Sequence, residues 1–210
     1  SSSGANNDGV VNTGTFDGED LVVLDGTDTI NVNVTDSTNV TLGDEGANLL
    51  ISNGETATID ASAADDDKVL TLTGAGSAVV TGLVADIDAG GGNVDGVPQA
   101  ALSGTLNVTT NTDTNTQTIE IATGTNTTTV AASDAADTVN IDAEAMADGK
   151  ALTLSGAADV DVSNVMADVT STVTGDLDVT LDDDETANVS TTISSSGANN
   201  DGVVNTGTFD

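Results

Sequence analysis

Short runs of alternating apolar and polar residues recur along the whole chain, and Gly, Asn or Asp separates one run from the next. Alternate positions are the period of a β-strand with one buried face. The segment nearest to a helical pattern, residues 60–67, is too short and too polar to be stable as a helix. The chain is therefore predicted to be all-β, with strands at Leu21–Leu24, Thr29–Val34, Asn39–Leu42, Asn48–Ile51, Ala57–Ile59, Val69–Leu72, Ala78–Thr81, Leu83–Ile87, Leu102–Thr109, Gln117–Ala122, Thr127–Val130, Thr138–Ile141, Leu152–Leu154, Val160–Val162, Asp168–Val173, Asp176–Leu181 and Ala187–Ile193.

The sequence contains a long tandem repeat. The first seventeen residues, SSSGANNDGVVNTGTFD, return without a change as residues 194–210, at an offset of 193 (194 − 1 = 193). Repetition at a fixed period is typical of stacked repeat architectures. We therefore expect residues 1–193 to be one full repeat and residues 194–210 to be the start of the next identical one.

A second, weaker repeat lies inside this period. Residues 59–86 and 141–168 align without a gap at an offset of 82 (141 − 59 = 82), with 14 identities in 28 positions. The period is thus a diverged pair of halves. The spacing between the halves includes GGGNVDGVPQA, residues 90–100, which holds the only proline, and we predict that this stretch is an inserted surface loop.

The kind of apolar residue decides between two β architectures. Apolar residues make up 37% of the chain, but there is no Trp or Tyr, and the two Phe are the same repeat position seen twice. Tandem β-sandwich domains, as in many adhesins, usually bury aromatic side chains. A parallel β-solenoid fills a thin core with small aliphatic ones, so it is the predicted fold. At about 20 residues per coil, one period would hold roughly nine or ten coils and advance about 45 Å.

Charge excludes several partners. Two Lys oppose 35 Asp and Glu, which gives a formal net charge of −33. Nucleic acid and anionic membrane surfaces both require basic patches, so we expect neither as a partner. No apolar segment is long enough to insert into a membrane. The lysines, Lys68 and Lys150, occupy equivalent positions in the two halves, and we interpret each as a counter-charge for the acids of its own turn.

Catalysis is not expected from these residue types. Paired carboxylates could hydrolyse glycosidic bonds, but sugar sites also use aromatic platforms and Arg or His, and the chain has no Trp, Tyr, Arg, His or Cys. Nucleophilic triads fail for the same reason. Arrayed threonines, as in Thr112–Thr118 and Thr125–Thr129, also suggest ice or crystal binding, although Thr is a common strand residue.

Several phrases resemble a known class of repeats. LTLTGAGSAVVTGL and LTLSGAADVDVSNV, each preceded by IDA and followed by GTLNVT or GDLDVT, are similar to the degenerate repeats of bacterial surface-layer proteins and of RTX-type calcium-binding secreted proteins. The RTX nonapeptide is represented by fragments such as Gly26–Ile30 and Ala136–Val139. The resemblance implies a secreted or cell-surface bacterial protein with isolated calcium sites.

Calcium is the expected cofactor, because it binds carboxylate and carbonyl oxygens on flexible turns rich in Gly, Asn and Asp. The alternative is a solvated acidic surface without specific sites. The candidate ligands are Asp28, Asp44, Glu45, Asp65, Asp66, Asp67, Asp134, Asp137, Asp182, Asp183, Asp184 and Glu185. The recurring Asp60 and Asp142 could equally be turn formers.

These observations predict a structural, extracellular repeat protein without enzymatic activity: a fibre, surface layer or adhesin stalk. Its expected partners are copies of itself, joined head-to-tail or by a continuous chain. The alternative is a calcium-dependent adhesive module that recognises glycan or protein through residues 90–100.

Overall fold

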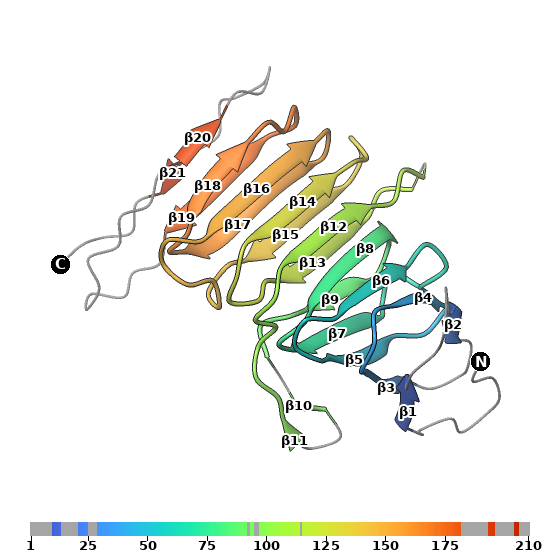
Figure 1. Cartoon of the computed structure of the whole chain (residues 1–210). Coiled ribbons are helices and arrows are strands. Elements are labelled where there is room, and N and C mark those ends of the chain that lie inside the picture. Colours follow the sequence, from blue (N-terminus) through green and yellow to red (C-terminus); the bar gives the residue numbers. More distant parts are fainter. Residues whose placement is uncertain are drawn as a thin grey trace.

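Apart from one short hairpin, consecutive strands of the chain fall alternately into two different sheets, as Figure 1 shows for the computed structural model. The structure describes residues 10–13, 21–24, 29–91, 93–94, 97–113, 115–181, 193–195 and 204–205. Within these residues there is no helix, as predicted. No helix that could span a membrane is therefore found in the described part of the chain.

Each sheet is parallel throughout. The ten-stranded sheet, here sheet 1, contains in spatial order β1 (Val10–Thr13), β3 (Ile30–Val34), β5 (Ala47–Ile51), β7 (Val69–Gly74), β9 (Asp86–Asp88), β13 (Thr118–Ala122), β15 (Thr138–Asp142), β17 (Asp159–Val165), β19 (Leu177–Leu181) and β21 (Val204–Asn205). The nine-stranded sheet, sheet 2, contains β2 (Leu21–Leu24), β4 (Thr38–Leu42), β6 (Thr56–Asp60), β8 (Ser77–Leu83), β12 (Leu106–Thr110), β14 (Thr128–Ala132), β16 (Ala151–Gly156), β18 (Asp168–Ser171) and β20 (Ile193–Ser195). One coil of the chain therefore contributes one strand to each sheet.

This arrangement confirms the predicted parallel β-solenoid and excludes the sandwich. Coil length varies around the expected value. Val32 and its partner Leu49 are 17 residues apart (49 − 32 = 17), and Leu49 and Leu72 are 23 apart (72 − 49 = 23). The strands stay in register because the corners between them differ in length.

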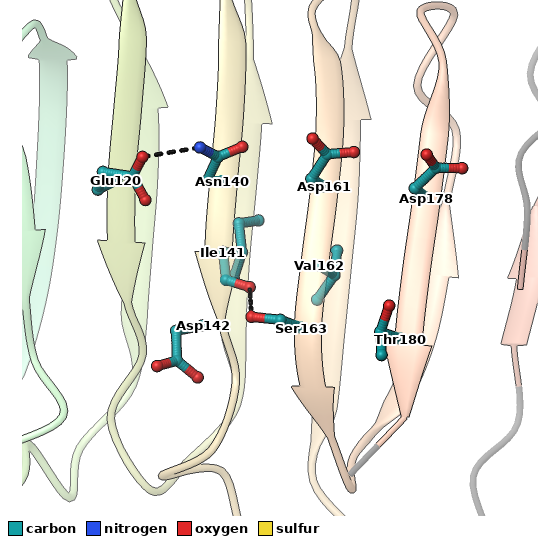
Figure 2. Close-up of a pocket in the computed structure, with 9 residues that line it drawn as sticks. All are labelled: Glu120, Asn140, Ile141, Asp142, Asp161, Val162, Ser163, Asp178 and Thr180. Carbon is teal, nitrogen blue, oxygen red and sulfur yellow. Dashed lines mark hydrogen bonds between the residues drawn. The ribbon is translucent and has the colours of Figure 1, made fainter. Parts of the chain in front are cut away.

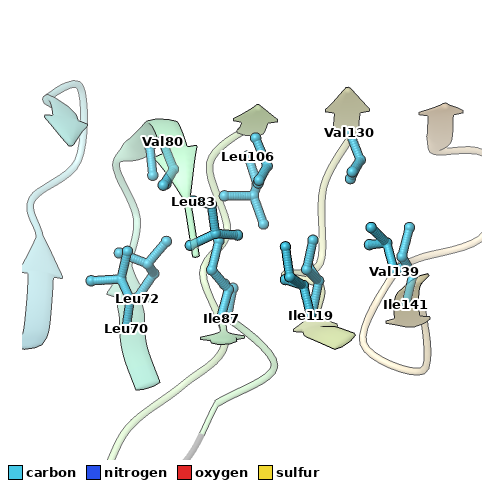
Figure 3. Close-up of a cluster of buried hydrophobic side chains, with 14 of the residues drawn as sticks. Leu70, Leu72, Val80, Leu83, Ile87, Leu106, Ile119, Val130, Val139 and Ile141 are labelled. Atoms are coloured by element: carbon cyan, nitrogen blue, oxygen red, sulfur yellow. The ribbon is translucent and has the colours of Figure 1, made fainter. Parts of the chain in front are cut away.

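The core lies between the two sheets and consists of aliphatic columns. Along sheet 1, Leu70, Ile87, Ile121, Ile141 and Val162 are paired in register on successive strands and are buried. Figure 3 shows side chains of sheet 2 facing this layer across the interior. The buried cluster of the described residues contains only Val, Leu, Ile, Ala and Met, as the composition predicted.

The inserted segment leaves the solenoid. Between β9 and β12 the chain forms an antiparallel hairpin of β10 (Asn93–Val94) and β11 (Val97–Pro98), which projects from the body in Figure 1. The insertion lengthens its coil to 34 residues from Ile87 to Ile121 (121 − 87 = 34) without changing the pairing.

Some strand boundaries were predicted wrongly. The run Leu83–Ile87 is not a single strand: β8 ends at Leu83, a two-residue corner follows, and β9 begins at Asp86. The run Leu102–Thr109 becomes a strand only from Leu106. The strands β1, β20 and β21 were not predicted as such, and most of Ala187–Ile193 lies outside the described residues.

The two halves of the internal repeat keep their local structure, but their equivalent strands lie in opposite sheets. Residues 59–86 begin in β6 of sheet 2, whereas residues 141–168 begin in β15 of sheet 1. Equivalent turns form equivalent hydrogen bonds: the N–H of Lys68 donates to Asp65 O and that of Lys150 to Ala147 O, each at 3.2 Å. The offset of 82 residues thus corresponds to an odd number of solenoid strands. Because these strands alternate between the sheets, each strand of one half has its equivalent in the other sheet.

Candidate functional site

The most distinctive polar surface is a row of side chains across the outer face of sheet 1. Glu120, Asn140, Asp161 and Asp178 come from β13, β15, β17 and β19 and are paired in register (Figure 2). They point outward because their strand neighbours, such as Ile121 and Ile141, are the inward column of the core. We call these four residues the acidic row.

A groove runs beside the acidic row. It has a volume of about 390 Å³ and is also lined by Asp142, Ser163 and Thr180. Its walls are held by side-chain hydrogen bonds: Asn140 Nδ2 donates to Glu120 Oε1 at 2.7 Å, and Ser163 Oγ donates to the Ile141 carbonyl at 3.3 Å. The groove is therefore a preformed polar surface with a single sign of charge.

Burial and like charges raise carboxyl pKa values on this face. The pKa of Asp161 lies above its ordinary value, first because of burial and then because of Asp178 and Asp159. Burial also raises the pKa of Asp86, with Glu120 and Asp66 adding to the effect, although the Glu120 N–H donates a hydrogen bond to Asp86 Oδ1 at 2.9 Å. Both carboxyls therefore bind a proton more tightly in the folded chain than in the unfolded chain.

A second groove, of about 350 Å³, lies over Ala122 on the same sheet. Ala122 is paired with Asp88 on one side and with Asp142 on the other, so a small side chain separates two carboxylates. Glu144 also lines the groove. Within the residues that the structure describes, no group of three or more acids is arranged to hold a metal ion.

Two predicted clusters of calcium ligands meet at one corner, and Lys68 joins them. The Asp65 N–H donates to the Asp44 carbonyl at 3.2 Å, which stacks the two turns. Lys68 Nζ lies 3.5 Å from Glu45 and 3.3 Å from Asp67. The hydrogen bond to Asp67, followed by the charges of Asp67 and Glu45, raises the pKa of Lys68. The expected neutralising role is therefore found for Lys68, while Asp65 and Asp66 are exposed beside it.

Asp134 and Asp137 are turn-forming residues. Asp134 Oδ1 accepts a hydrogen bond from the Ala136 N–H at 2.9 Å, and Asp137 Oδ1 accepts one from the Gln117 N–H at 2.9 Å. Asp137 is only 3% exposed, and this burial, with the charges of Asp134 and Asp113, raises its pKa. Gln117 Oε1 is buried beside this corner without a hydrogen-bond partner.

The recurring aspartates also form turns. Asp60 Oδ1 accepts hydrogen bonds from the N–H and hydroxyl of Ser62, at 3.1 and 2.7 Å. Its counterpart Asp142 accepts from the Glu144 N–H and from Asn164 Nδ2, both at 3.0 Å. The remaining candidate ligands, Asp28 and 182–185, lie outside the described residues.

The acidic row was missed by sequence reasoning because its members are far apart along the chain. A partial signal was present. The segments DVDV, residues 159–162, and DLDV, residues 176–179, place acids at every second position of a strand, which puts them on one outward face. Only the register between coils shows that Asp161 lies beside Asp178.

Comparison with known proteins gives no relative: no family model, no curated protein and no solved structure matches this chain. The class of protein is therefore defined by the fold alone, as a two-sheet parallel β-solenoid built from tandem repeats.

Proposed function

We propose that this chain is a structural repeat of an extracellular fibre, surface layer or adhesin stalk, without enzymatic activity of its own. The observation that carries this proposal is the position of the repeated sequence. Val204–Asn205 of β21 are the repeat copies of Val11–Asn12 in β1 (204 − 193 = 11). Both strands belong to sheet 1, at its opposite edges.

The sequence period therefore agrees with the solenoid period. From β1 to β20 the described strands number nine in each sheet, and β21 begins the next set. A further repeat would continue both sheets in phase, with no change of sheet at the junction. Nine strands at about 4.8 Å give an axial advance of roughly 43 Å per repeat.

Fibre diffraction and electron microscopy test the proposal. The chain, and a tandem of two 193-residue repeats, should form filaments with strands perpendicular to the axis and a meridional spacing of about 4.8 Å. The axial repeat should be close to 43 Å, by the strand spacing given above. Isolated particles at all concentrations, without an axial repeat even in the tandem chain, would contradict a fibre-forming role.

Calcium is proposed as a stabilising ion of this fibre. Support comes from the excess of acids and from the outward acidic row, where protein counter-charges are few. Carboxylates on neighbouring strands are the kind of oxygen ligands that calcium bridges. The corner of Glu45 and Asp67 is a weaker candidate, because Lys68 already binds both carboxylates.

The hairpin supports a second candidate function, adhesion. β10 and β11 are outside both sheets, so the solenoid register does not depend on them. Such an excursion can present a ligand site on a rigid stalk. Deleting residues 92–98 should abolish binding of the chain to a glycan array or cell surface while leaving filaments intact. Unchanged binding after the deletion would exclude the hairpin as the adhesive site.

A further inference from the structure

One strand sequence is seen with two different neighbours. In β1, Val11 and Asn12 are paired with Val32 and Asn33 of β3. In β21 the same two residues of the repeat, Val204 and Asn205, are paired with Val179 and Thr180 of β19. Among the described strands, β1 and β21 are the edges of sheet 1, so each has one neighbour.

The two pairings are compatible in one strand. Val32 and Val179 are both buried on the inward side of sheet 1, and the repeated valine is paired with one of them in each case. A parallel strand bonds its two neighbours through alternate backbone groups, and it can therefore serve both edges together. β21 of one copy could thus hold β19 of its own chain and β3 of a second copy.

Strand exchange and simple stacking of whole chains give different strand counts. The described strands number ten in sheet 1 and nine in sheet 2. If β21 of one copy lay beside β1 of the next copy, each copy would contribute ten strands to sheet 1 but only nine to sheet 2. If β21 instead replaced β1, each copy would contribute nine strands to each sheet, and the open edges β20 and β2 would meet.

We propose that separate copies of this chain join by strand exchange: β21 of one copy displaces β1 of the next and pairs with its β3, Val204 opposite Val32 and Asn205 opposite Asn33. The displaced and incoming residues are identical, so the pairing with β3 is conserved. The inference rests on the proposed fibre function and specifies its junction. Backbone pairing at a sheet edge is an established mode of association.

Engineered disulfides test the register, since the chain has no cysteine. Neighbouring strands lie about 4.8 Å apart, which is within the Cα separation that a disulfide accepts. Full-length N33C/N205C should form a ladder of covalent dimers, trimers and longer species on mild oxidation, read on a non-reducing gel. The peptide SSSGANNDGVVNTGTFD, added before oxidation, should suppress this ladder because it competes for β3.

Three controls separate the alternatives. The single variants N33C and N205C report random collision and should give at most dimers. N12C/N33C should close a disulfide within one chain when the chain is dilute, and the oxidised chain should fail to assemble until it is reduced, because β1 can then not be displaced. N12C/N205C should give no ladder, because exchange does not place β21 beside β1.

Each other result overturns the exchange in a recognisable way. A ladder from N12C/N205C but not from N33C/N205C, with an axial repeat near 48 Å for ten strands at about 4.8 Å, would show stacking of whole chains. That outcome would refute the exchange and leave the fibre function standing. No ladder from either pair and no filaments by microscopy would refute both.

Discussion

Ile121 shows how a single residue holds the solenoid together. It lies in register between Ile87 and Ile141, and all three side chains are buried. A solenoid core has only one layer of such side chains on each sheet, so a gap has few neighbours that can move in to fill it.

We expect Ile121→Ala to lower the free energy of unfolding by about 2–5 kcal/mol, because it removes buried methyl groups and leaves a cavity. Thr118→Ala, on the exposed side of the same strand, is the matched control and should change stability by about 0.5 kcal/mol or less. Urea unfolding followed by circular dichroism measures both. Equal effects of the two substitutions would contradict the inward column.

Asp161 makes stability depend on pH. Its pKa is raised in the folded chain, so the folded state binds more protons than the unfolded state between the ordinary and the raised pKa. Stability should therefore be greatest at acidic pH, below the ordinary value of 3.8, and should fall as pH rises through the raised pKa. Asp86 and Asp137 act in the same direction.

Asp161→Asn should raise the thermal midpoint at pH 7 and leave it nearly unchanged at pH 3, because the amide cannot be charged beside Asp178 and Asp159. Glu144→Gln removes one charge from an exposed position and is the control for a general decrease in net charge. If both variants show the same pH profile, the local crowding of carboxylates at Asp161 is not the cause.

At the scale of elements, two equivalent glycines end equivalent strands. Gly74 and Gly156 are 82 residues apart and have positive φ angles of 98° and 115°. At each of them an added Cβ would overlap the backbone of the preceding coil, at Ile51 and at Ala132. The Ala132 carbonyl also accepts hydrogen bonds from the two residues after Gly156, at 2.7 and 3.1 Å.

Gly156→Ala should therefore lower the free energy of unfolding by more than about 1 kcal/mol, since both the left-handed backbone and the close approach are lost. Gly149→Ala is the control: its φ is 74°, but nothing lies near the added Cβ. Gly149→Ala should lower the free energy of unfolding only by the cost of placing alanine in the left-handed region. Differential scanning calorimetry of the pair separates crowding from conformation, and equal decreases would argue against the close approach.

The elements were predictable where alternation determines them. Period-2 runs located most strands, and the lack of aromatic residues selected a thin aliphatic core. Bulges were less visible: at the equivalent positions Gly82 in β8 and Asn164 in β17, where the register shifts, φ is 65° and 56°. Both residue types tolerate the left-handed region, which hides the bulge from a search for glycine.

The candidate site was less predictable than the strands, because it depends on the register between coils. Acids close together in sequence were predicted to be calcium ligands, yet one such pair, Asp134 and Asp137, accepts hydrogen bonds from backbone N–H groups. Because the coils differ in length, Glu120 lies beside Asp86, 34 residues earlier in the chain. No local sequence pattern indicates this separation.

Over the whole molecule, charge is distributed unequally between the two faces. Sheet 1 carries the acidic row, whereas the in-register outward column of sheet 2 includes Asn107, Thr129, Thr153 and Thr170, which are all neutral. Val79 and Asn107 interrupt the threonines of this column, so it is not a regular threonine ladder. Repulsion between acids on the described paired strands is therefore concentrated on sheet 1.

This repulsion determines the expected response to ions. Paired strands place Asp161 and Asp178 on neighbouring coils about 4.8 Å apart, where two like charges repel by roughly 1 kcal/mol in water and by more at a partly buried surface. Calcium bound to the folded chain would remove the repulsion and stabilise the fold by mass action. Sodium chloride would reduce it by screening alone.

Thermal unfolding should therefore be compared in calcium, in chelator, and in chelator with high sodium chloride. We expect the highest midpoint in calcium and the lowest in chelator at low salt. Asp178→Asn should reduce the difference between calcium and chelator if the acidic row holds the ion, whereas Asp148→Asn, at an exposed turn, should not. Equal midpoints in calcium and chelator would refute specific binding. Full recovery by sodium chloride would show that the acids require only screening, because a monovalent salt lowers repulsion without bridging carboxylates.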